Sequence, residues 1–113
     1  MTPEQQRAIL EAAAKACGLI IVGSTKYNLL IASEGCRQGY LWNSIANSAD
    51  TASMCAKLDI DTIWTDRTVI CADDSREREQ EVRHDGTPEG KEAAWRLAAS
   101  TVAAKVGGYA DDI

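Results

Sequence analysis

The chain has 113 residues, of which 45% are hydrophobic, and a formal net charge of −5. This length predicts a single domain over 1–113 that folds without disulfides or bound metals. The negative charge argues against direct nucleic-acid binding, which needs a basic surface. The longest apolar run, 19–22, is too short to span a membrane, so we expect no membrane partner.

The first residues predict a helix followed by two strands. Thr2 and Gln5 have the capping-box spacing that is typical of a helix start, so we expect a helix over 2–17. Two β-rich runs, 19–22 and 27–32, then favour a hairpin.

A polar loop and a short strand lead from this hairpin to a second helix. We expect the loop over 33–39, the strand over 40–42 and the helix over about 47–58. Four side chains are expected to form the inward face of this helix: Ala52, Cys55, Ala56 and Leu58.

The second half of the chain predicts another hairpin, formed by 60–64 and 67–72. Residues 73–81 are dense in charge and poor in apolar side chains, so they are expected to form a long exposed loop. Val82 and its neighbours are expected to return as a short edge strand, which alternating charges would protect from unwanted pairing.

The last element is predicted to be a long helix. Thr87 is expected to cap it, with Pro88 at its start, and its apolar spacing continues over 89–106. Residues 109–113 are expected to form a frayed tail. The predicted fold is therefore α+β, with three helices (amino-terminal, middle and carboxy-terminal) packed with a small antiparallel sheet of about four or five strands in hairpins.

The negative charge is concentrated in one segment. Residues 59–85 hold nine acidic and four basic side chains, whereas the remaining residues hold eight of each sign. Such a segment is typical of a solvated surface, and it also suits a basic protein partner. The candidate partner-binding residues lie in this segment: Trp64, Asp66, Asp73, Asp74, Glu77 and Glu79.

The sequence predicts no catalytic site, no metal site and no cofactor. His84 is the only histidine, and we expect it to be solvated at the end of a hairpin. Asp59 and Asp61 would share one face if both lay in a strand, but their spacing is not that of a calcium loop. We therefore expect a protein that is not an enzyme.

We expect the cysteines to be reduced thiols of a cytoplasmic protein, because the first residues lack the basic region and apolar run that are typical of a signal peptide. Cys17, Cys55 and Cys71 fall in helix or strand patterns and are expected to be buried as small hydrophobes. Cys36 lies in the polar loop and is expected to be exposed. Of the three tryptophans, at least two are expected in the core, because the chain has no phenylalanine.

Two stretches of the chain resemble a family of small tailed-phage proteins. The first, Trp42–Leu58, is similar to a pattern with a Trp-Asn-Pro-Leu start, an acidic turn and an Asp-Ala-x-x-Leu-Ala-x-Lys-Leu helix. Ser44 stands where proline is usual, and Ile45 where leucine is. The matching residues are Trp42, Asn43, Asp50, Lys57 and Leu58.

The second stretch, Thr87–Gly107, resembles the closing helix of the same family, with Val106 in place of isoleucine. Its matching residues are Pro88, Ala93, Ala94, Arg96, Ala98, Ala103, Ala104 and Gly107. The family is the phage ABA-sandwich domain family. The resemblance implies a compact α+β sandwich made in an infected bacterium, with no established activity and no catalytic residues to transfer.

Two functions follow as hypotheses. The first is a phage accessory protein in the host bacterial cytoplasm that binds a host protein stoichiometrically, for example as an anti-CRISPR-like inhibitor of a defence complex. The second is a domain that sequesters a small molecule such as a nucleotide, with Trp42 or Trp64 stacked on a base. The oligomeric state is open, because the alanine-rich faces could pack against a second copy, as a homodimer, or against a sheet.

Overall fold

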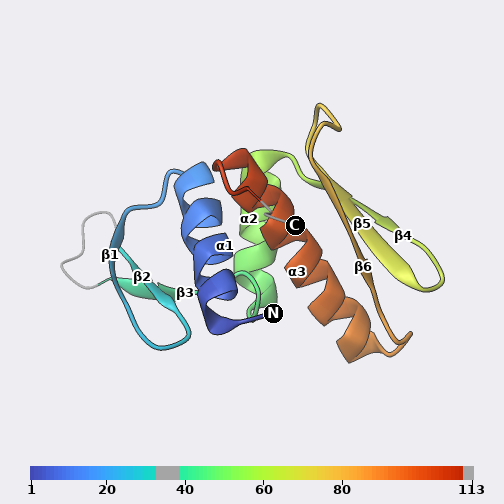
Figure 1. Cartoon of the computed structure of the whole chain (residues 1–113), viewed down its shortest axis with the longest axis horizontal. Coiled ribbons are helices and arrows are strands. Elements are labelled where there is room, and N and C mark those ends of the chain that lie inside the picture. The colour runs from blue at the N-terminus through green and yellow to red at the C-terminus, as the bar shows by residue number, and fades with distance from the viewer. Residues whose placement is uncertain (33–38, 111–113) are drawn as a thin grey trace.

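The computed structural model describes residues 1–32 and 39–110, and within them the fold is α+β (Figure 1). It contains three helices and two antiparallel sheets of three strands each, which we call the first and the second sheet. The elements in chain order are α1 (Pro3–Ala16), β1 (Ile21–Ser24), β2 (Leu29–Ile31), β3 (Tyr40–Trp42), α2 (Ser48–Leu58), β4 (Asp61–Trp64), β5 (Thr68–Ala72), β6 (Glu79–Arg83) and α3 (Pro88–Val106).

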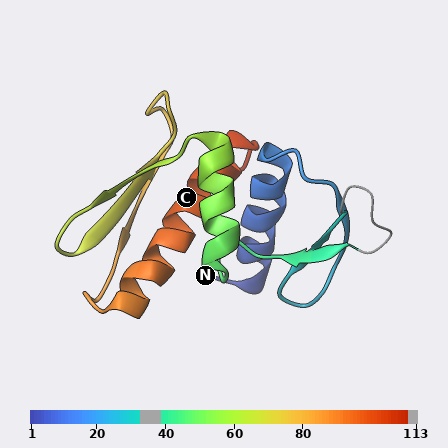
Figure 2. The ribbon, with the colours of Figure 1, turned by 180° about the vertical axis from the view of Figure 1, so that it is seen from behind.

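The α+β class and the three helices are confirmed, but the single sheet of about four or five strands is wrong. The first sheet has the order β1-β2-β3 and the second has the order β4-β5-β6. The helices lie between the two sheets, as the opposite views of Figures 1 and 2 show. Because α2 separates β3 from β4 in the chain, each group of strands covers its own side of the helix layer.

The central element of this layer is α3. All seven residues over 98–104 are buried, so this part of the helix is covered on every side. Its neighbours are α1, α2, β5 and β6. Gly107, directly after α3, lies so close to the backbone of α1 that a Cβ atom would overlap the carbonyl oxygen of Ala12. Small side chains therefore allow the helices to approach closely.

The predicted helix starts are confirmed by their caps. Thr2 Oγ1 accepts a hydrogen bond from Gln5 N at 3.1 Å, and Gln5 Oε1 accepts one from Thr2 N at 2.8 Å. Thr87 Oγ1 accepts a hydrogen bond from Gly90 N at 3.0 Å at the start of α3. Each cap satisfies backbone donors that the first helical turn leaves unpaired.

The inward face expected for α2 is wrong at two of its four positions. Ala52 and Ala56 are exposed, whereas Thr51 and Met54 are buried. Thr51 takes an inward position because its hydroxyl group donates a hydrogen bond of 2.6 Å to the carbonyl oxygen of Ser44. A polar side chain can be buried at low cost when its hydrogen bond is made inside the protein.

Two of the three tryptophans contribute to the core, as expected. Trp42 is buried, and Trp95 is partly buried and packs against the core. Tyr109, which was expected in the frayed tail, packs against the same core, and its backbone N donates to Ala104 O at 2.9 Å. Residues 33–38 of the predicted loop, which include Cys36, and the last three residues lie outside the described part of the chain. Within the described part, no helix is both long and apolar enough to cross a bilayer.

Candidate functional site

The outer face of the second sheet combines apolar and acidic side chains. Ile63 of β4 pairs with Ile70 of β5, which in turn pairs with Glu81 of β6. Val69 and Cys71 alternate with Ile70 and are fully buried on the side of the helices. Side chains alternate along a strand, so Ile63, Ile70 and Glu81 point outward. We call this surface the acidic face and define it by Asp61, Ile63, Ile70, Glu79 and Glu81.

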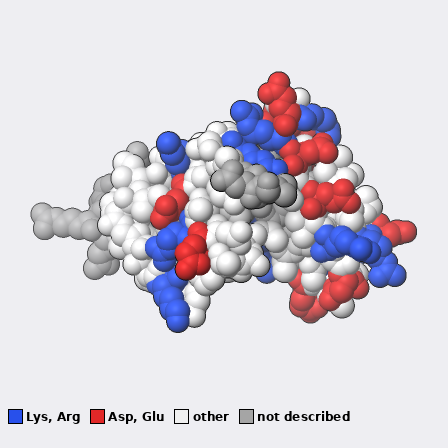
Figure 3. All heavy atoms as spheres, viewed as in Figure 1, with Lys and Arg blue, Asp and Glu red and all other residues white. Residues whose placement is uncertain are grey.

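Acidic and basic side chains gather over the second sheet, as Figure 3 shows at the end of the molecule that carries it. On the acidic face itself, Asp61, Glu79 and Glu81 are exposed around the two isoleucines. Arg76 Nη2 lies 3.9 Å from Asp61 Oδ2, and both side chains are more than half exposed. An exposed ion pair of this kind is weak, so it leaves the carboxylate available to a partner.

The loop between β5 and β6 is organised around Asp73. This carboxylate accepts hydrogen bonds from Arg78 Nη1 at 3.0 Å, from Arg78 N at 3.2 Å and from Ser75 Oγ at 3.1 Å. Partial desolvation acts to raise its pKa, but the bonds from Arg78 and Ser75 together hold that pKa below its ordinary value. The expected exposed loop over 73–81 is therefore wrong at both ends, since Asp73 is buried and β6 begins at Glu79.

The six candidate residues do not form one surface. Asp66 lies in the turn between β4 and β5, and Trp64 ends β4 beside it. Asp74, Glu77 and Glu79 lie at the opposite end of β5, which is about 16 Å long for its five residues. The candidate residues are close in the sequence, but the hairpins separate them in space. Asp73 makes its hydrogen bonds within its own loop.

A second feature lies near Trp64, where the second sheet meets the start of α3. Trp64 is 50% exposed and borders an open hollow of about 360 Å³. Trp95 lines the same hollow, and its Nε1 donates a hydrogen bond of 3.1 Å to Thr62 Oγ1. Lys91 and Glu92 place one charge of each sign at this hollow. It therefore offers aromatic surface and a cation to a small planar anion.

His84 differs from its expected solvated position, because it is buried. Its ring lies 6.1 Å from the ring of Trp64, measured between centroids, at an interplanar angle of 59°. Nδ1 accepts a hydrogen bond from Gly86 N at 3.1 Å. Nε2 has no hydrogen-bond partner among the described residues. No local sequence pattern indicates this burial, because Trp64 reaches His84 from a different hairpin.

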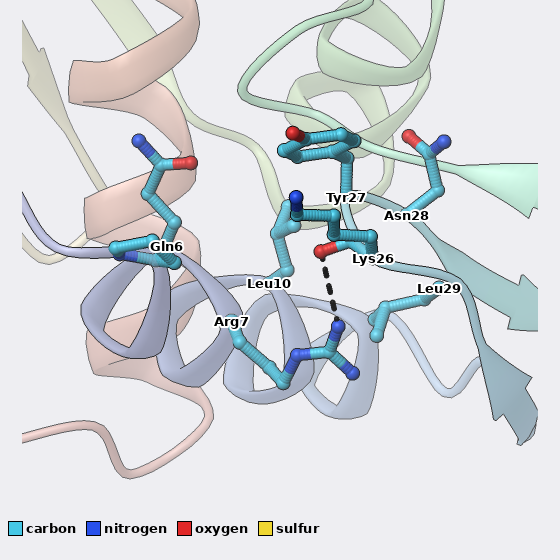
Figure 4. A pocket seen from close by; sticks show the side chains of 8 residues that line it. Gln6, Arg7, Leu10, Lys26, Tyr27, Asn28 and Leu29 are labelled. Atoms are coloured by element: carbon cyan, nitrogen blue, oxygen red, sulfur yellow. Dashed lines mark hydrogen bonds between the residues drawn. The ribbon is translucent and has the colours of Figure 1, made fainter.

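A smaller pocket lies between α1 and the turn that joins β1 to β2 (Figure 4). Arg7 reaches across it and donates hydrogen bonds to Ser24 Oγ at 2.6 Å and to Thr25 O at 2.7 Å. A third contact joins Arg7 Nη2 to Lys26 O at 3.3 Å. The pocket has a volume of about 50 Å³, enough for one or two water molecules. Arg7 therefore attaches the hairpin to α1 and is not free to bind a ligand.

The described cysteines have no features of reactive thiols. Burial raises the pKa of Cys17 and of Cys71, and it raises that of Cys55 to about 12. Thiols with raised pKa values carry little nucleophilic thiolate at neutral pH. Cys17 and Cys71 are buried as expected, whereas Cys55 is only half-buried.

Acidic and sulfur ligands do not converge on a metal site in the described part of the chain. Asp59 is the left-handed cap of α2, with a φ of 54°, and is not in a strand. It therefore does not share a strand face with Asp61, which begins β4.

The stretches Trp42–Leu58 and Thr87–Gly107 contact each other. Asn43 Oδ1 accepts hydrogen bonds from Ile45 N and Ala46 N, both at 3.0 Å, and builds the turn before α2. Arg96 of α3 donates from Nε to Ile45 O at 2.9 Å and from Nη1 to Ser48 Oγ at 3.0 Å. These matching residues thus hold α2 and α3 together, and their role is structural.

Comparisons of the chain with known protein families, with curated proteins and with solved structures found no match.

Proposed function

We propose that this chain is a phage accessory protein that binds a host bacterial protein stoichiometrically through the acidic face. In this proposal it works in the host cytoplasm as an anti-CRISPR-like inhibitor of a defence complex. The phage origin rests on the resemblance of Trp42–Leu58 and Thr87–Gly107 to small phage proteins. The observation that carries the binding role is the apolar centre of Ile63 and Ile70, bordered by the exposed carboxylates of Asp61, Glu79 and Glu81. Exposed Arg83, which pairs with Thr68, borders the same face at its other end.

This arrangement fits the anatomy of protein interfaces. An apolar centre supplies the burial energy of association, and a polar rim remains accessible to solvent. The carboxylates of Asp61, Glu79 and Glu81 would steer a basic partner toward the face and fix its orientation. A defence complex that handles nucleic acid presents a basic groove, which is a partner of the required charge.

Reversal of two charges tests this proposal. The double variant Glu79→Lys/Glu81→Lys is expected to weaken capture of the host protein from infected cells by at least about tenfold, mainly through slower association. The matched control is Glu4→Lys/Glu11→Lys, which reverses two exposed charges on α1 and should bind as the wild type does. Circular dichroism verifies the fold of both variants. Equal capture by the acidic-face variant and the wild type would contradict the proposal.

The hollow beside Trp64 favours a second candidate, the binding of a small planar molecule such as a nucleotide. Its volume of about 360 Å³ is within the range of small-molecule sites, roughly 300–1,000 Å³. Trp64 is exposed enough to stack on a base, and Lys91 is available to a phosphate, whereas Trp42 is buried and has no such role.

Heat release followed by mass spectrometry tests this candidate. Wild-type protein incubated with host extract is expected to release a metabolite that the Trp64→Ala variant does not retain. Tyr27→Ala is the matched control, because Tyr27 is also an exposed aromatic residue but lies on the other hairpin. The candidate fails if wild-type protein releases no metabolite or if Trp64→Ala releases the same one.

A further inference from the structure

Strand β4 forms one edge of the second sheet, because the strand order is β4-β5-β6. Thr65 N donates a hydrogen bond of 2.9 Å to Thr68 O across the turn that leads to β5. In an antiparallel pair, residues whose N–H and C=O bond to the neighbouring strand alternate with residues whose N–H and C=O point away from it. By this alternation, the backbone groups of Thr62 and Trp64 point away from β5. We call these outward backbone groups the β4 edge.

The hydrogen bonds on the other side of β5 have the matching alternation. His84 N donates to Arg67 O at 2.8 Å, and Asp73 N donates to Arg78 O at 3.0 Å, so the odd-numbered residues of β5 bond to β6. The even-numbered residues of β5 therefore bond to β4, as the assignment of the β4 edge requires. Among the described residues, the groups of the β4 edge have no hydrogen-bond partner.

The opposite edge of the same sheet, at β6, is occupied by side chains. Lys105 Nζ donates to Glu79 O at 3.2 Å, and Gln80 Nε2 donates to Glu81 O at 3.3 Å. Strand β4 has the sequence Asp-Thr-Ile-Trp and thus contains neither a proline nor a lysine, the residues that commonly block pairing at an edge. The β4 edge is therefore the side of the second sheet that is open to a further strand.

The hollow beside Trp64 lies next to this edge. In the part of the chain that the structure describes, its lining comes from the end of β4, from Thr65 and from α3, and none of it comes from β5 or β6. Thr62 and Trp64 pair with Cys71 and Val69 of β5, which are buried toward the helices. Directly paired residues share one face of a sheet, so the side chains of an added strand opposite Thr62 and Trp64 would point toward the hollow.

The charge around β4 indicates the kind of segment that fits. Residues 59–66 contain three aspartates, all exposed, and no basic side chain. Side chains on the outward face of an added strand would lie beside Asp61 and Ile63 of the acidic face. The ion pair between Arg76 and Asp61, at 3.9 Å, is exposed and weak, so a basic side chain of a partner can replace Arg76 there.

We propose that an extended segment of the partner protein pairs with β4 as an additional, antiparallel strand of the second sheet. Its backbone bonds to the β4 edge, and its side chains alternate between the acidic face and the hollow. Basic side chains suit the outward positions beside Asp61. An aromatic or β-branched side chain suits the hollow, because Trp64 and Trp95 line it. This inference rests on the proposed function for the host protein as partner, and it names the part of that protein that binds.

A synthetic peptide tests the pairing without the host protein. The probe is Lys-Val-Lys-Trp-Lys-Val-Lys with blocked termini, whose valines and tryptophan face the helices when its tryptophan is opposite Trp64. Titration followed by nuclear magnetic resonance is expected to give saturable shifts of the Thr62 and Trp64 amide signals. Hydrogen exchange of both amides should slow, because each gains a hydrogen-bond acceptor. No saturable binding up to about 2 mM peptide would overturn the proposal.

Methylation of the peptide nitrogens distinguishes backbone pairing from attraction between charges. In the antiparallel register, the nitrogens of the tryptophan and of the second valine donate to β4. N-methylation of these two residues is expected to weaken binding at least about tenfold. The matched control is N-methylation of the two lysines that flank the tryptophan, because their N–H groups point away from β4 and binding should not change. Equal binding of the two methylated peptides would overturn the proposal.

A proline in the protein provides a second test. Thr62→Pro removes an N–H from the β4 edge without removing a backbone bond to β5, and it is expected to weaken peptide binding at least about tenfold. Arg83→Pro is the matched control, because it removes an outward N–H from β6, and it should bind the peptide at least as tightly as the wild type. Circular dichroism verifies both folds, and the methylated peptides decide if Thr62→Pro does not fold. Equal binding by folded Thr62→Pro and the wild type would contradict the pairing.

Capture of the host protein from infected cells distinguishes this inference from the proposed function. If Thr62→Pro captures the host protein as the wild type does, and Glu79→Lys/Glu81→Lys does not, the acidic face binds without an added strand and the pairing is overturned. If the peptide binds to the β4 edge but no host protein is captured, the pairing is supported and the proposed function fails.

Discussion

Asp73 stabilises a loop of the fold, although its acidic sequence context suggests a binding surface. It is the one buried carboxylate in the described part of the chain, and two residues of its own loop supply its three hydrogen bonds. We expect Asp73→Asn to lower the urea midpoint at about pH 7, because the amide cannot pair with Arg78 as a carboxylate does. Equilibrium unfolding followed by circular dichroism measures this midpoint.

The pH dependence of Asp73→Asn distinguishes the contribution of the Asp73 charge to stability from the contribution of its shape. Its folded-state pKa is below the ordinary value of 3.8, so the stability that the charge contributes is present above this value. This contribution is lost as the pH falls through the lower, folded-state pKa. The difference in midpoint between wild type and Asp73→Asn should therefore shrink at low pH. Asp74→Asn, at the exposed neighbouring residue, is the control, and equal midpoints for Asp73→Asn and wild type at about pH 7 would contradict this role.

At the scale of elements, the contact between α1 and the end of α3 depends on a missing side chain. A Cβ atom on Gly107 would overlap the backbone oxygen of Ala12, which cannot rotate away as a side chain can. We expect Gly107→Ala to lower the free energy of unfolding by about 1–3 kcal/mol, as overpacking typically does. Gly23→Ala is the control, because its Cβ would make only ordinary contacts at 3.6 Å with Leu30. Equal losses of stability in both variants would contradict this account.

The helices and hairpins were predictable from the sequence because their signals are local. The capping box of Thr2 and Gln5 and the cap of Thr87 predict helix starts within one residue of those observed. The inward face of α2 was not predictable in the same way. Thr51 replaces an apolar residue there because of a hydrogen bond to Ser44, and Ser44 in turn bonds to Ser100 of α3 at 2.7 Å. A pattern of apolar residues contains no information about such partners.

At the scale of the whole molecule, the division into two sheets was not predictable from strand patterns. Local alternation indicates which residues form strands but does not indicate which strands share a sheet. The same limit applies to the candidate site: Asp66 and Glu77 are close in the sequence, yet they lie at opposite ends of β5. His84 was likewise misplaced, because the burial of its ring involves Trp64 from another hairpin.

The layered architecture predicts an order of local stability across the molecule. Helix α3 contacts α1, α2, β5 and β6, and its residues over 98–104 are all buried, so its amides open only when most of the structure opens. The first sheet is attached through fewer side chains, mainly Leu29, Ile31 and Trp42, and leaves its other face exposed. Hydrogen exchange should therefore be slowest in α3 and faster in β1 and β2.

Hydrogen exchange of the wild-type protein in the native state measures this order of local stability. Mass spectrometry of peptic peptides from 20–32 and 96–105 distinguishes the two regions. Protection of the first sheet equal to that of α3 would contradict the layered order, because one central helix would then not determine the stability of the core.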